Sequence, residues 1–157
     1  MALKSNFNES KSMRDVQSQA EILNEKILNS FIMAGEEFVK DAREQIQDHA
    51  AGTYLDQTTN LRNSIGYFVY HNGVMVKENL IGNAVANKEI VQEFINPKGF
   101  QLIGIAGMNY ASHVESKGYN VISYQADACV VNLAGYLENL EVLQKGTAAQ
   151  IEEEFIP

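Results

Sequence analysis

The feature that most constrains this chain is a regular spacing of apolar residues near its N-terminus. Within residues 12–50 they recur every three or four positions, at Val16, Ala20, Leu23, Ile27, Phe31, Ala34, Phe38, Ala42 and Ile46. This spacing places them on one face of an α-helix. Ser12 to Asp15 resembles a capping box at its start, and Gly35 is a site for a bend or a break.

Such a helix would be roughly 58 Å long at about 1.5 Å per residue, much longer than a typical globular helix. The hundred or so residues that follow are too few to cover it. We therefore hypothesise that another subunit buries part of its apolar face. The chain as a whole has 157 residues, the length of one ordinary domain, in which residues 1–11 are expected to be flexible.

Composition excludes several classes of function. The 20 acidic and 12 basic residues give a net charge of −8, which argues against free nucleic-acid binding. No stretch approaches a transmembrane helix, and no secretory signal precedes the first helix, so a cytoplasmic protein is expected. The single cysteine, Cys129, rules out an internal disulfide framework and is interpreted as a small core residue.

A hairpin follows a loop at residues 51–60. Asn60 is expected to cap a single turn. The run from Ile65 to Tyr70 is rich in β-branched and aromatic residues, and Asn72-Gly73 separates it from a second such run at 74–76. An Asn-Gly pair between two such runs predicts a type I′ turn.

A strand, a corner and a helix are predicted for the second half. A helix capped by Asn87 would bury Ile90, Val91, Phe94 and Ile95. Residues 100–107 are predicted to form a buried strand, and residues 119–122 a short extended segment. Ser123 is expected to begin a second long helix, closed by Gly146 and followed by a short helix from Thr147. Its predicted apolar face comprises Ala126, Val130, Leu133, Leu137, Leu140 and either Val142 or Leu143.

These elements predict an α+β domain, with long N-terminal and C-terminal helices packed on one face of a small, mainly antiparallel sheet. The pattern contains no zinc-ligand spacing, nucleophile elbow or phosphate-binding loop. His113 and Glu115 form the only acid–base pairing, but residues two apart on a helix do not face each other. No catalytic residue, metal site or cofactor is therefore predicted.

Two motifs resemble those of the small neck proteins of long-tailed bacteriophages, known as head–tail joining, head–tail connector or tail-completion proteins. One precedes the hairpin and the other follows the third strand, and they read Tyr54-x-x-x-Thr58-x-Asn60-Leu61-Arg62-Asn63-Ser64-Ile65 and Tyr110-Ala111-x-x-Val114-Glu115-x-x-Gly118. The resemblance covers roughly residues 12–143 in element order. Residues 80–99 would be an insertion relative to the family.

The resemblance implies a structural virion protein without enzymatic activity. Such proteins assemble as a homo-oligomeric ring between the portal-side connector and the tail. DNA passes through the lumen without specific binding, and no membrane is involved. The expected location is the neck or tail region of the virion, and the host cytoplasm during assembly. A related position, at the tail-tube end, is an alternative within the same class.

The resemblance also suggests interaction or structural residues. Arg62 would hold its loop through Asp56 or a carbonyl, and Tyr110 would fix the corner. His113 and Glu115 would make a subunit contact, or Glu115 would anchor a loop. Independently of the resemblance, the place of Gly118 just past a helix-ending lysine predicts a positive φ. The alternative from another class is a small α+β hydrolase or ligand-binding domain, with a site built from His113, Glu115 and Tyr67.

Overall fold

The structure is a computed structural model that describes residues 9–45, 60–82, 88–107, 116 and 121–153. The elements are, in chain order, α1 (Glu9–Gln45), α2 (Asn60–Asn63), β1 (Ile65–His71), β2 (Val74–Asn79), α3 (Lys88–Val91), η2 (Gln92–Phe94), β3 (Phe100–Ala106) and α5 (Ser123–Glu153).

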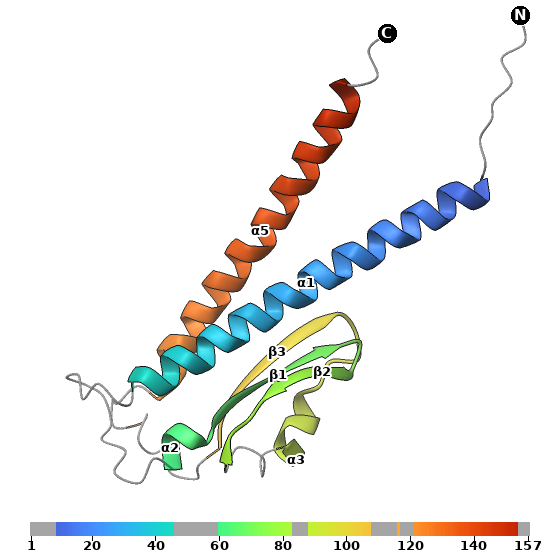
Figure 1. The fold of residues 1–157 in the computed structure, drawn as a ribbon. Coiled ribbons are helices and arrows are strands. Elements are labelled where there is room, and N and C mark those ends of the chain that lie inside the picture. Colours follow the sequence, from blue (N-terminus) through green and yellow to red (C-terminus); the bar gives the residue numbers. More distant parts are fainter. Residues whose placement is uncertain (1–8, 46–59, 83–87, 108–115, 117–120, 154–157) are drawn as a thin grey trace, which may run out of the picture.

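The fold is α+β, as the sequence predicts. The sheet has the order β2-β1-β3, and β1 is antiparallel to both neighbours. Helix α1 crosses one face of the sheet, and α5 packs against α1 (Figure 1). The short helices α3 and η2 cover the other face, where Val91 packs on Phe68 and Tyr70. The sheet is thus covered on both faces, whereas the sequence analysis placed helices on one.

Strand β1 is the buried centre of the sheet. All residues from Ile65 to Tyr70 are buried, whereas β3 is half-buried and its Gly104 is exposed. The strand predicted at 100–107 is therefore confirmed, but its full burial is wrong, because β3 lies at an edge. Alternate residues of β1 contact opposite layers: Tyr67 belongs to the core under α1, and Phe68 to the core under α3.

The predicted hairpin is confirmed. Asn72 and Gly73 have φ values of 51° and 78°, the positive values that a type I′ turn requires at both central positions. The Asn72 side chain also accepts a hydrogen bond from the Gly99 backbone N–H at 2.9 Å, which ties the turn to the chain entering β3. The single turn predicted at Asn60 is present as α2.

Gly73→Ala is expected to lower the free energy of unfolding by about 1–2 kcal/mol, because alanine is strained at positive φ. A steric clash is not the cause of this loss, since the atom nearest to an added Cβ would be the Pro97 Cα at 3.4 Å. Gly73→Asn is the matched control, because asparagine tolerates this conformation better than alanine. Urea denaturation measures both, and equal losses for the two variants would contradict the explanation.

Helix α1 differs from the prediction at its start and its middle. It begins at Glu9, so Ser12 lies inside the helix and is not its cap. It also continues without interruption through Gly35, where a bend or break was predicted. A Cβ on Gly35 would lie 2.6 Å from the ring of Tyr67. The glycine therefore allows a close approach of α1 to β1. Residues 46–50 of the predicted helix lie outside the described part of the chain.

Helix α5 is longer than predicted, and its predicted apolar face is only partly buried: Leu133, Leu137 and Leu140 are half-buried, whereas Ala126 and Val130 are exposed. It begins at Ser123 as predicted, but it runs through Gly146 to Glu153 as one helix. Val130 is 69% exposed, whereas Gln125 and Cys129 are buried against the rest of the chain. Residues 121–122 form a bend rather than a strand, and residues 119–120 are outside the described ranges.

The helix predicted around residues 88–95 is present as α3 and η2, but only half of its predicted face is covered. Val91 is buried and Ile95 packs beside it. Ile90 and Phe94 are 61% and 62% exposed. Lys88 holds α3 to β2 through an ion pair with Glu78, with an Nζ–Oε2 distance of 2.7 Å. The proposed cap, Asn87, lies outside the described residues.

The main core lies between α1, β1 and the start of α5. Cys129 belongs to it at 8% exposure, which confirms its prediction as a small core residue. Its thiol donates a weak hydrogen bond to the Ala34 carbonyl at 3.5 Å, and burial raises the thiol pKa. A buried, protonated thiol is a packing group rather than a nucleophile.

Candidate interaction surface

Only one of the interaction residues suggested by the sequence lies in the described part of the chain. Tyr110, His113, Glu115 and Gly118 fall in residues 108–115 and 117–120, outside it. Arg62 lies in α2 and is half-buried. The functional surface must therefore be built from other residues, which the fold places together.

Arg62 lies near a second arginine, Arg43, at the C-terminal end of α1. Arg43 donates a hydrogen bond from Nη2 to the Ile65 carbonyl at 2.7 Å, which joins the end of α1 to the start of β1. Burial lowers the pKa of Arg43, and the neighbouring Arg62 charge adds to the effect. The expected partner of Arg62, Asp56, is outside the described residues, so its role in holding the loop stays a prediction.

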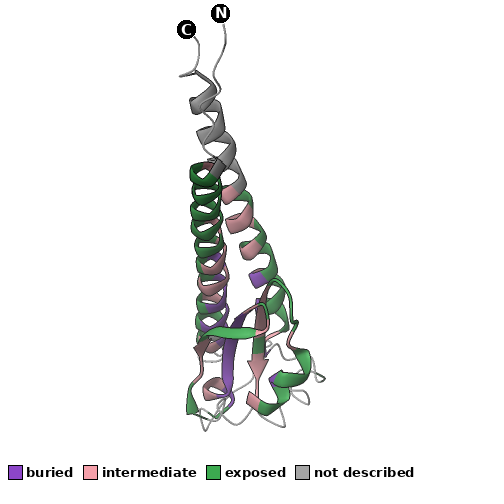
Figure 2. Cartoon of the chain, turned by 90° about the vertical axis from the view of Figure 1, so that its right-hand side faces the viewer, coloured by how far each residue is buried: buried purple, intermediate pink, exposed green. Residues whose placement is uncertain are grey.

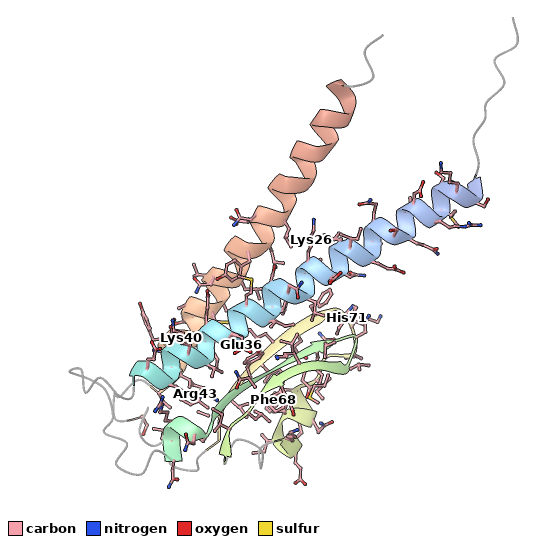
Figure 3. All side chains as sticks on the ribbon, in the orientation of Figure 1. Lys26, Glu36, Lys40, Arg43, Phe68 and His71 are labelled. Atoms are coloured by element: carbon pink, nitrogen blue, oxygen red, sulfur yellow. The ribbon has the colours of Figure 1, made fainter. Side chains whose placement is uncertain are left out.

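Two adjacent glutamates set the position of α1. Glu36 accepts hydrogen bonds from the Tyr67 hydroxyl at 2.8 Å and from the Asn79 side chain at 2.7 Å, and thereby ties α1 to β1 and β2. Glu37 accepts them from the Tyr136 hydroxyl at 2.6 Å and the Asn132 side chain at 3.2 Å, and ties α1 to α5. Glu36 and Arg43 both project from the sheet side of α1 (Figure 3).

These contacts hold the C-terminal half of α1, and its N-terminal half extends beyond the sheet. Buried residues gather where the helices meet the sheet, and the extending part of α1 is exposed (Figure 2). Five apolar residues continue along this part at spacings of three and four: Met13, Val16, Ala20, Leu23 and Ile27, here called the α1 stripe. Met13 and Val16 are 63% and 68% exposed.

The α1 stripe is narrow and has the three–four spacing of a coiled-coil seam. It lies on the same helix face as Phe31, Ala34 and Phe38, which follow it at the same spacings. Further along, Ala34 and Phe38 are buried at 0% and 4% exposure. One continuous apolar face of α1 is thus covered by the chain itself in its second half. It is half-buried at Leu23 and Ile27 and exposed from Met13 to Ala20.

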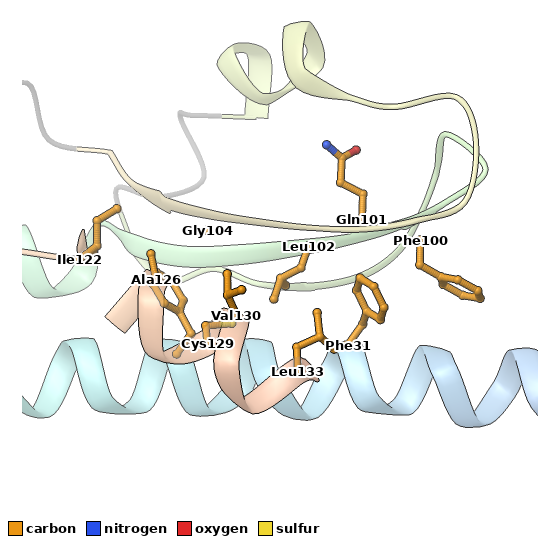
Figure 4. A pocket seen from close by; sticks show the side chains of 11 residues that line it. Phe31, Phe100, Gln101, Leu102, Gly104, Ile122, Ala126, Cys129, Val130 and Leu133 are labelled. Carbon is orange, nitrogen blue, oxygen red and sulfur yellow. The ribbon is translucent and has the colours of Figure 1, made fainter. Parts of the chain in front are cut away.

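An apolar groove of about 420 Å³ lies where this face meets β3 and α5 (Figure 4). Phe31 and Phe38 of α1 line it, together with Leu102 of β3 and Val130 and Leu133 of α5. Gly104 allows the Phe38 ring to approach β3, because a Cβ there would lie 2.8 Å from the ring. No sequence pattern predicted this groove. The exposed Val130, predicted as part of the apolar core face, lies on its α5 side.

The described residues offer little for the alternative hydrolase site. Tyr67 is 0% exposed, and its pKa is raised by burial and by its hydrogen bond to Glu36. A substrate cannot reach a phenol in this position. Within the described ranges, no group of three His, Cys, Asp or Glu side chains is placed to hold a metal ion. His71 stacks flat on Phe100 with ring centroids 4.1 Å apart, which is a packing arrangement.

Among the described helices, none has both the length and the apolar character needed to cross a membrane. Comparisons with protein-family models, with curated proteins and with solved structures find no match for this chain.

Proposed function

We propose that this chain is a structural protein of the bacteriophage neck, which assembles as a ring between the portal-side connector and the tail. The observation that carries the proposal is the α1 stripe, in which Met13, Val16 and Ala20 are exposed and Leu23 and Ile27 are half-buried. Contiguous exposed apolar residues on a soluble chain mark an interaction surface, and the narrow spacing fits another helix as the partner. The motif around Asn60–Ile65 and the corner motif supply the resemblance to the neck family.

The overall charge is compatible with this role. The chain carries a net charge of −8, so a ring of such chains repels the phosphate backbone on average. Repulsion suits a channel through which DNA slides, because attraction to the wall would retard its passage. The ring is held by apolar contacts, which do not depend on the sign of the charge.

The first test is the assembly state in sedimentation velocity. We expect the unchanged chain to sediment as a large oligomer, and the variant Met13→Glu/Val16→Glu, at two exposed stripe positions, as a monomer, because two charges would have to be buried in the interface. Ser18→Glu/Asn29→Glu adds the same charges on the opposite face of α1, at exposed positions, and should still assemble. A monomeric unchanged chain at working concentration would reject self-assembly.

The second test concerns the place of action. Electron microscopy of particles made without this protein should show filled heads that are not joined to tails. Normal infectious particles would reject the neck assignment even if the purified chain assembles.

A further inference from the structure

We propose that the groove between α5 and β3 receives the first part of α1 from a neighbouring copy, so that the contact in the ring runs head to tail. This inference rests on the proposed self-assembly and adds which two surfaces meet. One partner contributes the α1 stripe, from Met13 to Ile27. The other contributes the groove, with Leu102, Val130 and Leu133 on its walls.

The groove has the character of a helix receptor. Its named lining is almost wholly apolar, with Gln101 as the one polar side chain among the described residues that line it. Its volume of about 420 Å³ exceeds the ~150 Å³ that holds a benzene-sized group, so it can take more than one aliphatic side chain. An amphipathic helix laid into an apolar groove is a common mode of recognition.

The size of the contact is sufficient for a specific interface. Residues 10–27 form a helical rod about 27 Å long and about 11 Å wide, and seating half of its circumference buries on the order of 500 Å² per partner. Because Leu23 and Ile27 are already half-buried in their own chain, the total of about 1,000 Å² is an upper limit, at the lower edge of specific interfaces. Each chain in a ring makes this contact twice, once with its stripe and once with its groove.

A second copy is the occupant because each chain carries both halves of the contact. Each chain has one partly exposed stripe and one open groove. Both are covered when the stripe of every copy binds the groove of the next, which is a heterologous contact that can close into a ring. A two-fold contact of stripe on stripe would cover the projecting helices but leave Leu102 and Gly104 of β3 open, since they lie at the base of α1 rather than at its tip.

Cysteine cross-linking tests this geometry in the full chain. In a Cys129→Ala background, Val16→Cys is combined with Val130→Cys, and oxidised samples are separated on a non-reducing denaturing gel. The position of the helix along the groove decides which stripe residue faces Val130 of the neighbouring copy. Met13→Cys and Ala20→Cys are therefore paired with Val130→Cys in the same way. We expect at least one pair to give a ladder of covalent multimers, while each single-cysteine chain stays monomeric on the gel.

Ser18→Cys with Val130→Cys is the control, because Ser18 lies on the opposite face of α1 from the stripe. Efficient cross-linking of Val16→Cys alone would indicate a two-fold contact of stripes and would overturn the inference. The absence of any ladder from chains that still sediment as a ring would overturn it as well, but would leave the proposed function intact. If the unchanged chain does not assemble, both proposals fail together.

Discussion

Replacing Gly35 with alanine lowers the free energy of unfolding by about 1–3 kcal/mol, the range expected for overpacking a core. This loss is expected although alanine is the better helix former by about 1 kcal/mol. The added Cβ would lie 2.6 Å from Cδ2 and Cε2 of the Tyr67 ring. That ring is 0% exposed, so it cannot step aside without moving the sheet or the helix. Urea denaturation followed by circular dichroism measures the change.

Gly135→Ala is the matched control in the other long helix. A Cβ at Gly135 would have no described neighbour within 4 Å, so only the helix propensity changes. We expect this variant to be more stable than the unchanged chain by about 0.5–1 kcal/mol. If both glycine variants gained stability, the close packing of α1 on β1 would not be as tight as the structure has it.

The contrast between these two glycines shows which structural roles can be predicted from the sequence and which cannot. Both stand inside amphipathic helical patterns, and locally nothing separates them. Gly35 differs because Tyr67, more than thirty residues later, lies across it. From the sequence, Gly35 therefore predicts a bend or a break, which is what a glycine inside a helix indicates locally. Its actual role depends on a contact between distant segments.

Features that depend on neighbouring residues were predicted well. The Asn72-Gly73 turn follows from the backbone preferences of two adjacent residues, and its register then aligns β1 with β2. The fold class follows from the order of the elements. Which strand is central does not follow from that order: residues 100–107 are as apolar as a buried strand, yet β1 occupies the middle of the sheet.

The candidate surface was predicted in part for the same reason. The spacing from Val16 to Ile27 is local, and the length of the helix already implied that something else must cover it. The groove is not local, because it needs Phe38, Gly104 and α5 in one place. On α5, Cys129 packs into the core against α1, and Cys129 and Val130 both line the groove.

Tyr67→Ala should cause the largest loss of stability, about 3–5 kcal/mol, the cost typical of removing a buried aromatic ring. The ring fills the contact between α1 and the central strand, and the hydroxyl binds Glu36 at 2.8 Å. Tyr67→Phe keeps the ring and removes only the hydrogen bond. Glu36 is exposed and can bind water instead, so we expect a loss of about 1 kcal/mol. Equal losses for the two variants would show that the hydrogen bond, and not the ring, holds α1 in place.

A double-mutant cycle with Tyr67→Leu then links the ring to the glycine beneath it, and it remains measurable if Tyr67→Ala does not fold. Leucine lacks Cε2 and the rigid ring, and its Cγ and Cδ atoms can adopt another rotamer away from an alanine at position 35. In the Tyr67→Leu background, Gly35→Ala should therefore cost less than in the unchanged chain. The expected coupling is about 1–3 kcal/mol, as for residues in direct contact. Additive losses would mean that the two positions do not constrain each other, and that α1 is placed over the sheet mainly by its polar contacts.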